Sequence, residues 1–192
     1  MHIRIPDHGE PPFPVFYFFD GHNLFRDEDA TYGKSWGLDE YCRNWDKQMI
    51  IVGVECAHGH NERMSEYLPY GVDYGWLKGI EPLGEATMQG IIYELKPYID
   101  TTFPTIPFRE CTAIGGSSMG GLMSLYGVIC HNGEFELKEY KPVSAPKSAE
   151  EGFARFDSQI SDCGRADLWC GRDCGMGSEQ GCQVELYGRF PV

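Results

Sequence analysis

The feature that most constrains the fold of this 192-residue chain is a set of three short apolar runs that alternate with helix-like segments. The runs are Val15–Phe19, Met49–Val54 and Cys111–Ile114, and the first is bounded by Pro14 and by Asp20-Gly21. Continuous apolar runs of this length indicate strands that are buried on both faces.

The segments between the runs have the spacing of amphipathic helices. Residues 36–45 are long enough for a short helix, and residues 85–100 and the stretch after residue 118 are periodic. The expected inner faces are Met88, Ile91, Ile92, Leu95 and Ile99 in the first periodic segment, and Leu122, Leu125, Tyr126 and Ile129 in the second. Strands alternating with helices predict an α/β fold with a mainly parallel sheet flanked by helices, and only Ile3–Ile5 is a candidate for an earlier strand.

Charge and hydropathy exclude several classes of partner. The 29 acidic and 16 basic residues give a formal charge of −13, which disfavours nucleic acid and anionic membrane surfaces. The longest apolar run is far too short to span a bilayer, and residues 1–8 lack the apolar middle of a secretory signal, so a cytoplasmic location is expected. The short N-terminal region leaves sheet edges exposed, which favours a homo-oligomer.

Composition divides the chain into a core, residues 1–150, and a divergent segment, residues 151–192. The second part has seven Gly, four Cys and no Lys, with no regular periodicity, and it is expected to pack poorly. Three explanations fit the composition of this segment: a tail stabilised by disulfides or metal, an insertion, or a tail read in the wrong frame. Its cysteines lack the paired spacing of a zinc knuckle, so no metal is predicted, whereas Cys42, Cys56, Cys111 and Cys130 are expected to be buried thiols.

The chemistry-bearing motif is Gly116-Ser117-Ser118-Met119-Gly120, which fits G-x-S-x-G. It follows a predicted strand and begins a predicted helix, as a nucleophile elbow must. Small residues are needed two positions before and after the nucleophile because the turn brings backbone segments close together. The start of the helix would present the Met119 N–H and a partial positive charge to an oxyanion.

Several further stretches resemble, in order and spacing, the esterase family of α/β-hydrolases that includes enterochelin, feruloyl and acetylxylan esterases. The resemblance covers residues 13–146, with 143–146 as the end of a further strand. The matching stretches are Phe18–Phe25, Ile51–Glu55, Arg63–Tyr70, Glu94–Asp100 and Gly115–Gly121. The resemblance implies a reduced α/β-hydrolase fold and hydrolysis of a small-molecule carboxylic ester without metal or organic cofactor.

The resemblance also implies roles for particular residues. Ser118 would be the acyl nucleophile, and the backbone N–H groups of Met119 and His22 would form the oxyanion hole. Asp20 is expected to fix its loop as a hydrogen-bond acceptor. Arg63, Glu66 and Tyr67 match a segment near the family's site, where an ion-paired structural role for Arg63 and Glu66 is equally compatible.

The pattern departs from the family downstream of the nucleophile, where the catalytic acid and histidine are expected. The last histidine is His131, which a continuing helix would carry about 20 Å from Ser118. His22, His58 and His60 are the other candidates for a base, and Asp167 and Asp173 match an acid poorly, so neither base nor acid is assigned. An acyltransferase and a non-catalytic, ligand-binding relative are the alternative functions.

Overall fold

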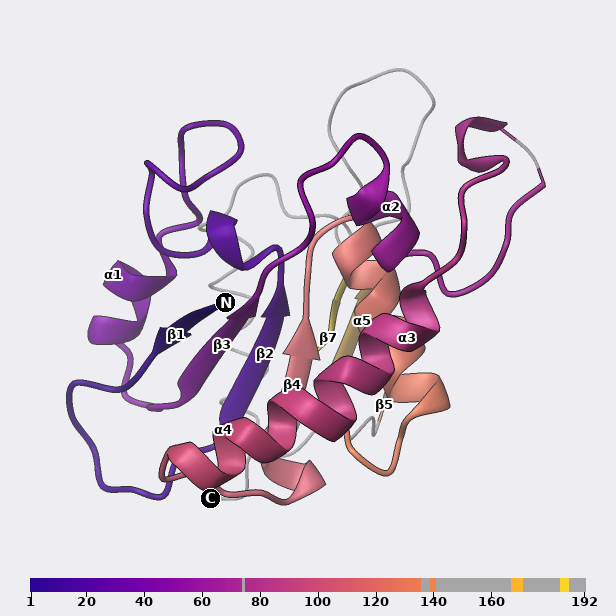
Figure 1. Cartoon of the computed structure of the whole chain (residues 1–192). Coiled ribbons are helices and arrows are strands. Elements are labelled where there is room, and N and C mark those ends of the chain that lie inside the picture. The colour runs from indigo at the N-terminus through magenta and orange to yellow at the C-terminus, as the bar shows by residue number, and fades with distance from the viewer. Residues whose placement is uncertain (74, 136–138, 141–166, 171–183, 187–192) are drawn as a thin grey trace.

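The three predicted buried runs form the centre of a mixed sheet. The computed structural model describes residues 1–73, 75–135, 139–140, 167–170 and 184–186 (Figure 1). Its four-stranded sheet has the order β1-β3-β2-β4, with β1 antiparallel to β3 and the other pairs parallel. The strands are β1 His2–Arg4, β2 Val15–Phe19, β3 Ile50–Val54 and β4 Thr112–Gly115. The predicted parallel sheet and the early edge strand are confirmed.

A second, three-stranded sheet follows later in the chain. It has the order β5-β6-β7, with β5 parallel to β6 and β6 antiparallel to β7. Its strands are β5 Glu139–Tyr140, β6 Asp167–Cys170 and β7 Val184–Leu186. The strand end predicted at residues 143–146, and the rest of the segment 151–192, lie outside the described residues.

Helices cover both faces of the four-stranded sheet. The described helices are α1 Leu38–Arg43, α2 Glu62–Glu66, α3 Gly84–Gly90, the π-helix η3 Ile91–Leu95, α4 Lys96–Thr102 and α5 Met119–Cys130. Of these, α2 has no buried residue and does not cover the sheet. Short 3₁₀ turns are η1 Gly21–Asn23, η2 Gly75–Leu77 and η4 Arg109–Cys111. Segments α3, η3 and α4 run on as one long helix beside α5 (Figure 1), as the periodicity of residues 85–100 predicts.

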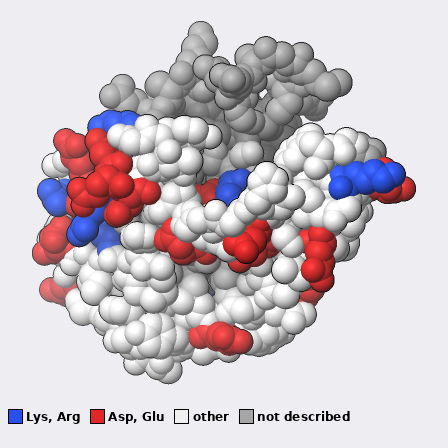
Figure 2. Space-filling model, turned by 45° about the horizontal axis from the view of Figure 1, so that its top comes forward, with Lys and Arg blue, Asp and Glu red and all other residues white. Residues whose placement is uncertain are grey.

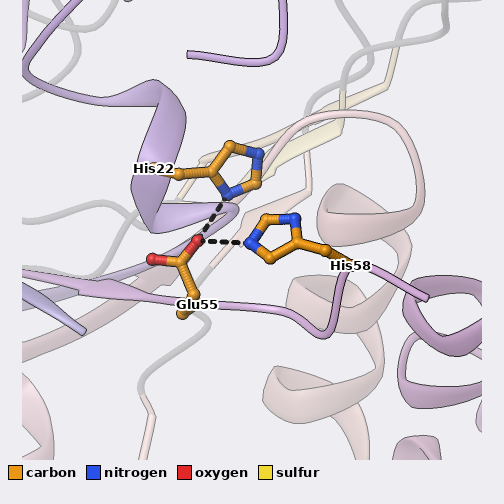
Figure 3. Close-up of side chains that lie close together, drawn as sticks. All are labelled: His22, Glu55 and His58. Atoms are coloured by element: carbon orange, nitrogen blue, oxygen red, sulfur yellow. Dashed lines mark hydrogen bonds and ion pairs between the residues drawn. The ribbon is translucent and has the colours of Figure 1, made fainter. Parts of the chain in front are cut away.

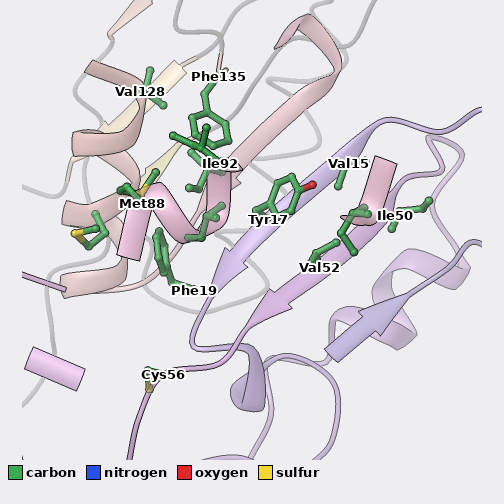
Figure 4. Packing of buried hydrophobic residues seen from close by; sticks show 14 of the residues in the cluster. Val15, Tyr17, Phe19, Ile50, Val52, Cys56, Met88, Ile92, Val128 and Phe135 are labelled. Atoms are coloured by element: carbon green, nitrogen blue, oxygen red, sulfur yellow. The ribbon is translucent and has the colours of Figure 1, made fainter. Parts of the chain in front are cut away.

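Alternate residues of β2 serve two separate cores, which explains why the whole strand is apolar. Val15, Tyr17 and Phe19 face the core formed with α3, η3, α4 and α5 (Figure 4). Phe16 and Phe18 face the opposite core, with α1. Met88, Ile91, Ile92 and Ile99 are buried in the first core and Leu95 is packed against it, so the predicted inner face of that helix is confirmed.

The predicted inner face of α5 is confirmed only in part. Leu125 and Tyr126 are partly buried and pack against the core. Leu122 and Ile129 are 43% and 58% exposed, whereas the buried positions are mainly small ones. These buried residues are Gly120, Gly121, Met123, Ser124, Gly127 and Val128. Glycine lets α5 approach its neighbours closely: a Cβ at Gly127 would lie 2.7 Å from the Met88 methyl carbon. Close approach, rather than large apolar side chains, therefore selects the buried face.

The surface charge follows the composition of the sequence, and the described helices differ from a membrane span. Acidic side chains outnumber basic ones on the face in Figure 2, in keeping with the formal charge of −13. Among the described helices, none has the length and apolar character needed to cross a bilayer.

Candidate active site

Ser118 occupies a strained turn between β4 and α5. Its φ of 55° and ψ of −118° are unfavourable for a residue with a side chain, and the rest of the elbow enforces them. A Cβ at Gly116 would lie 2.6 Å from the carbonyl carbon of Gly120, so Gly116 cannot carry a side chain without a shift of the backbone. Ser118 itself is exposed. This geometry is what the G-x-S-x-G spacing predicts.

The elbow packs against the end of β2. A Cβ at Gly120 would lie 2.9 Å from the Phe19 Cβ and 3.4 Å from an Asp20 carboxylate oxygen. The carboxyl ends of the parallel strands therefore bring Ser118 and the loop after β2 to the same edge of the sheet.

The loop after β2 turns sharply into η1 and brings His22 to this edge. Asp20 has a left-handed conformation, φ 59° and ψ 48°, and Gly21 contacts the backbone of β3 so closely that a Cβ would lie 2.5 Å from the Gly53 carbonyl carbon. His22 and Met119 both lie in the first turn of a helical segment, η1 and α5, where backbone N–H groups have no acceptor within the helix. Both N–H groups thus lie at the carboxyl edge of the sheet, where Ser118 also lies.

Asp20 fixes this loop as a buried acceptor, as expected. Arg63 donates two hydrogen bonds of 2.7 Å to its carboxylate, and the Tyr67 hydroxyl accepts a 3.1 Å bond from its backbone N–H. The hydrogen bonds with Asp20 are the main cause that raises the pKa of Arg63 above its usual range. Glu66 does not pair with Arg63 and accepts instead from the Ala57 N–H at 2.9 Å.

The six described histidines lie in four different places, and none of them hydrogen-bonds to Ser118. His8 is exposed on the loop after β1. His131 follows the last residue of α5, about 18 Å along the helix axis from the elbow, and its Nε2 lies 3.2 Å from Glu85. His60 is exposed on the loop after β3. His131 is therefore excluded as a partner of Ser118, as predicted.

Glu55, the residue directly after β3, is surrounded by His2, His22 and His58, the last two of which are drawn in Figure 3. Its Oε2 is 2.6 Å from His2 Nε2, and its Oε1 is 2.9 Å from His22 Nδ1 and 3.2 Å from His58 Nε2. Burial acts to raise the pKa of Glu55, but the hydrogen bond and charge of His2 and the nearby His22 outweigh it and lower that pKa. Sequence reasoning placed His22 and His58 at this edge but missed their convergence on Glu55. The signal was the position of Glu55 immediately after a strand parallel to β2.

A cleft of about 560 Å³ adjoins the loop that carries His22. Gly21, His22 and Phe25 line it from the loop after β2, and β1 and α1 contribute charged side chains on its far side. Ser118 is not among its lining residues, so this cleft extends from the loop toward β1 and away from the elbow.

The cysteines largely follow expectation. Cys42, Cys56 and Cys111 are buried free thiols, and burial raises the pKa of Cys42 and of Cys56 to about 11. Cys130 is exposed, contrary to prediction, because it ends α5 on the side away from the core. The four later cysteines have no described side chains. Asp167 lies in β6 without a described side chain, and Asp173 lies outside the described residues.

A parallel sheet whose strand ends carry a strained serine and a neighbouring loop of N–H donors defines a reduced α/β-hydrolase fold. The chain belongs to the esterase family described as "Putative esterase", which matches residues 1–138. No curated protein matches it.

Three solved structures share the fold at low sequence identity. The BES protein from Bacillus cereus has a TM-score of 0.56 at 20% identity over 88% of this chain and 68% of its own. An IroE-like serine hydrolase from Shewanella oneidensis has a TM-score of 0.54 at 18% identity, over 73% of this chain and 44% of its own. The enterobactin esterase from Shigella flexneri has a TM-score of 0.50 at 16% identity, over 73% of this chain and 31% of its own. The chain thus spans less than half the length of the latter two.

Proposed function

We propose that the protein hydrolyses small-molecule carboxylic esters through an acyl-enzyme on Ser118. The observation that carries this proposal is the strained, exposed serine held between Gly116 and Gly120 at the start of α5. Membership of the esterase family, and the serine hydrolase and esterase named among the solved structures, support the same chemistry.

In the first step the Ser118 Oγ attacks the ester carbonyl carbon, and a base takes the hydroxyl proton. The carbonyl oxygen becomes an oxyanion, which accepts hydrogen bonds from the Met119 and His22 N–H groups and is stabilised by the positive end of α5. Collapse of this intermediate breaks the bond to the alcohol, which leaves with a proton. Water then attacks the acyl-enzyme, releases the acid and restores Ser118.

The general base is left unassigned by the described residues. His22 and His58 both turn a ring nitrogen toward Glu55, and His131 pairs with Glu85 at the other end of α5. A serine elbow with only an oxyanion hole still retains about 10³–10⁴-fold acceleration over water. Slow turnover, with acylation slowed as well as deacylation, is therefore the expected behaviour of a chain without a base.

Labelling with a fluorophosphonate and hydrolysis of a short-chain nitrophenyl ester test the proposal. Ser118→Ala should abolish both, whereas Ser117→Ala, which changes the neighbouring hydroxyl, should retain both because that hydroxyl has no role in the steps above. Intact-protein mass spectrometry reports the covalent adduct. Equal labelling of Ser118→Ala and the parent would refute the assignment, and a parent that binds ester without any labelling would support a non-catalytic relative.

A cytoplasmic location and self-association also remain proposals. They are supported by the acidic composition and by the place of β1 at one edge of the four-stranded sheet. Cell fractionation tests the first. For the second, light scattering on the purified chain should give a mass above the 21.7 kDa of one copy.

A further inference from the structure

We infer that His22, Glu55 and His58 form a binding site for a divalent transition metal ion such as Zn²⁺. The site lies at the carboxyl end of β3 and uses the His22 side chain, whereas the proposed ester hydrolysis uses only the backbone N–H of that residue (Figure 3). Each residue offers one ligand atom, and the three atoms lie within 4.8 Å of one another. The inference stands whether or not the chain hydrolyses esters.

The spacing of the donor atoms suits coordination. Ligand atoms bound at about 2.1 Å from one ion lie about 3–3.5 Å apart. Glu55 Oε1 is 2.9 Å from His22 Nδ1 and 3.2 Å from His58 Nε2. The His58 side chain is 66% exposed and can swing to adjust the remaining separation between the two imidazoles.

The His22 ring contains an unsatisfied nitrogen aimed at this point. Its side chain is only 9% exposed, and Nδ1 lies close to the Glu55 carboxylate but makes no hydrogen bond of acceptable geometry. A buried ring nitrogen without a hydrogen bond is costly. A cation placed between Nδ1 and the carboxylate would satisfy both groups at once.

Neighbouring groups hold two of the ligands in place, as is usual around metal sites. Thr31 Oγ1 is 2.9 Å from His22 Nε2, and the Thr31 N–H in turn donates to Asn23 Oδ1 at 2.9 Å. The second oxygen of Glu55 is 2.6 Å from His2 Nε2, with the amino terminus 4.0 Å away. The non-ligating oxygen of Glu55 and the non-ligating ring nitrogen of His22 thus both have partners, and these contacts orient the ligand atoms.

The ligand set indicates the class of ion. Two imidazoles and one carboxylate favour Zn²⁺, Co²⁺ or Ni²⁺ over Mg²⁺ and Ca²⁺, which prefer oxygen-only sites. Three protein ligands leave a coordination position for water. Because His22 is part of η1, a bound ion would link the end of β3 to the loop after β2 and stabilise that loop.

Titration of the metal-free, full-length chain with Co²⁺ tests the site. One equivalent should bind with the visible absorption of nitrogen and oxygen ligands, and without the near-ultraviolet band of thiolate ligands, which separates this site from the eight cysteines. Binding should also raise the unfolding temperature.

Four variants locate the ion. His58→Ala and Glu55→Gln should abolish this equivalent, and Thr31→Val should weaken it by about 10–100-fold. His60→Ala removes an exposed imidazole from the same loop and should bind like the parent. Circular dichroism of the metal-free variants checks folding, which an exposed residue such as His58 should not affect. Failure to bind Co²⁺, thiolate absorption, or an equivalent that survives His58→Ala would each overturn the inference.

Discussion

At the scale of single residues, two buried tyrosines of the same core differ in whether their hydroxyls have partners. Tyr17 and Tyr67 are each 1% exposed. The Tyr67 hydroxyl accepts a hydrogen bond from the Asp20 N–H, whereas that of Tyr17, labelled in Figure 4, has no hydrogen-bond partner among the described residues. Burial is the main cause that raises the pKa of both well above the usual range, so both remain neutral.

The same substitution at these two positions should therefore have different effects. Tyr67→Phe leaves the buried Asp20 N–H without an acceptor and should lower the free energy of unfolding by about 1–3 kcal/mol. Tyr17→Phe removes an unsatisfied hydroxyl and should be neutral or slightly stabilising. Urea unfolding followed by circular dichroism measures both. A loss at Tyr17 equal to that at Tyr67 would show that the Tyr17 hydroxyl is satisfied.

At the scale of elements, two helical glycines differ in whether a neighbouring element packs against them. Gly120 in α5 contacts β2 so closely that a Cβ would lie 2.9 Å from the Phe19 Cβ. Gly90 ends α3 with helical dihedral angles, and a Cβ there would meet nothing within 4 Å. Only the first of these two glycines is required by packing.

We expect Gly120→Ala to destabilise the protein and Gly90→Ala to stabilise it. The first should cost about 1–3 kcal/mol because a strand and a helix must move apart. The second should add about 0.5–1 kcal/mol through the higher helix propensity of alanine. Thermal and urea unfolding of the two variants provide the comparison, and a stabilising Gly120→Ala would contradict the packing described for the elbow.

At the scale of the whole molecule, one sheet joins the two cores. Adjacent residues of β3, Ile50 and Ile51, face opposite cores, as do successive residues of β2. Both β2 and β3 contribute side chains to each of the two cores. Loss of packing on one face should therefore also destabilise the other face.

This coupling predicts a single unfolding transition for both cores. Met123→Ala on the α5 side and Leu38→Ala on the α1 side should each lower the free energy of unfolding by about 2–5 kcal/mol. Both should shift the same transition without changing its dependence on denaturant. Circular dichroism and tryptophan fluorescence should give coincident curves. Separate transitions, each sensitive to one variant, would show that the two faces unfold independently.

Local pattern was enough to predict the strands, the long helix and the elbow. Buried strands need continuous apolar runs, an amphipathic helix repeats every 3.6 residues, and a nucleophile turn needs Gly116 and Gly120 near the serine. These requirements act over a few residues, so they are legible in the sequence. The sequence did not reveal the buried glycines of α5, because close approach favours glycine there and glycine carries no hydrophobic signal.

Only the tertiary structure decided which distant polar groups meet. Parallel pairing of Phe19 with Val54 places His22 beside Glu55, and antiparallel pairing of His2 with Gly53 brings in a second imidazole from the opposite direction. The Asp20–Arg63 pair likewise joins residues 43 positions apart. Such contacts depend on strand order and register, which arise when the whole core packs, and no local spacing in the sequence encodes them.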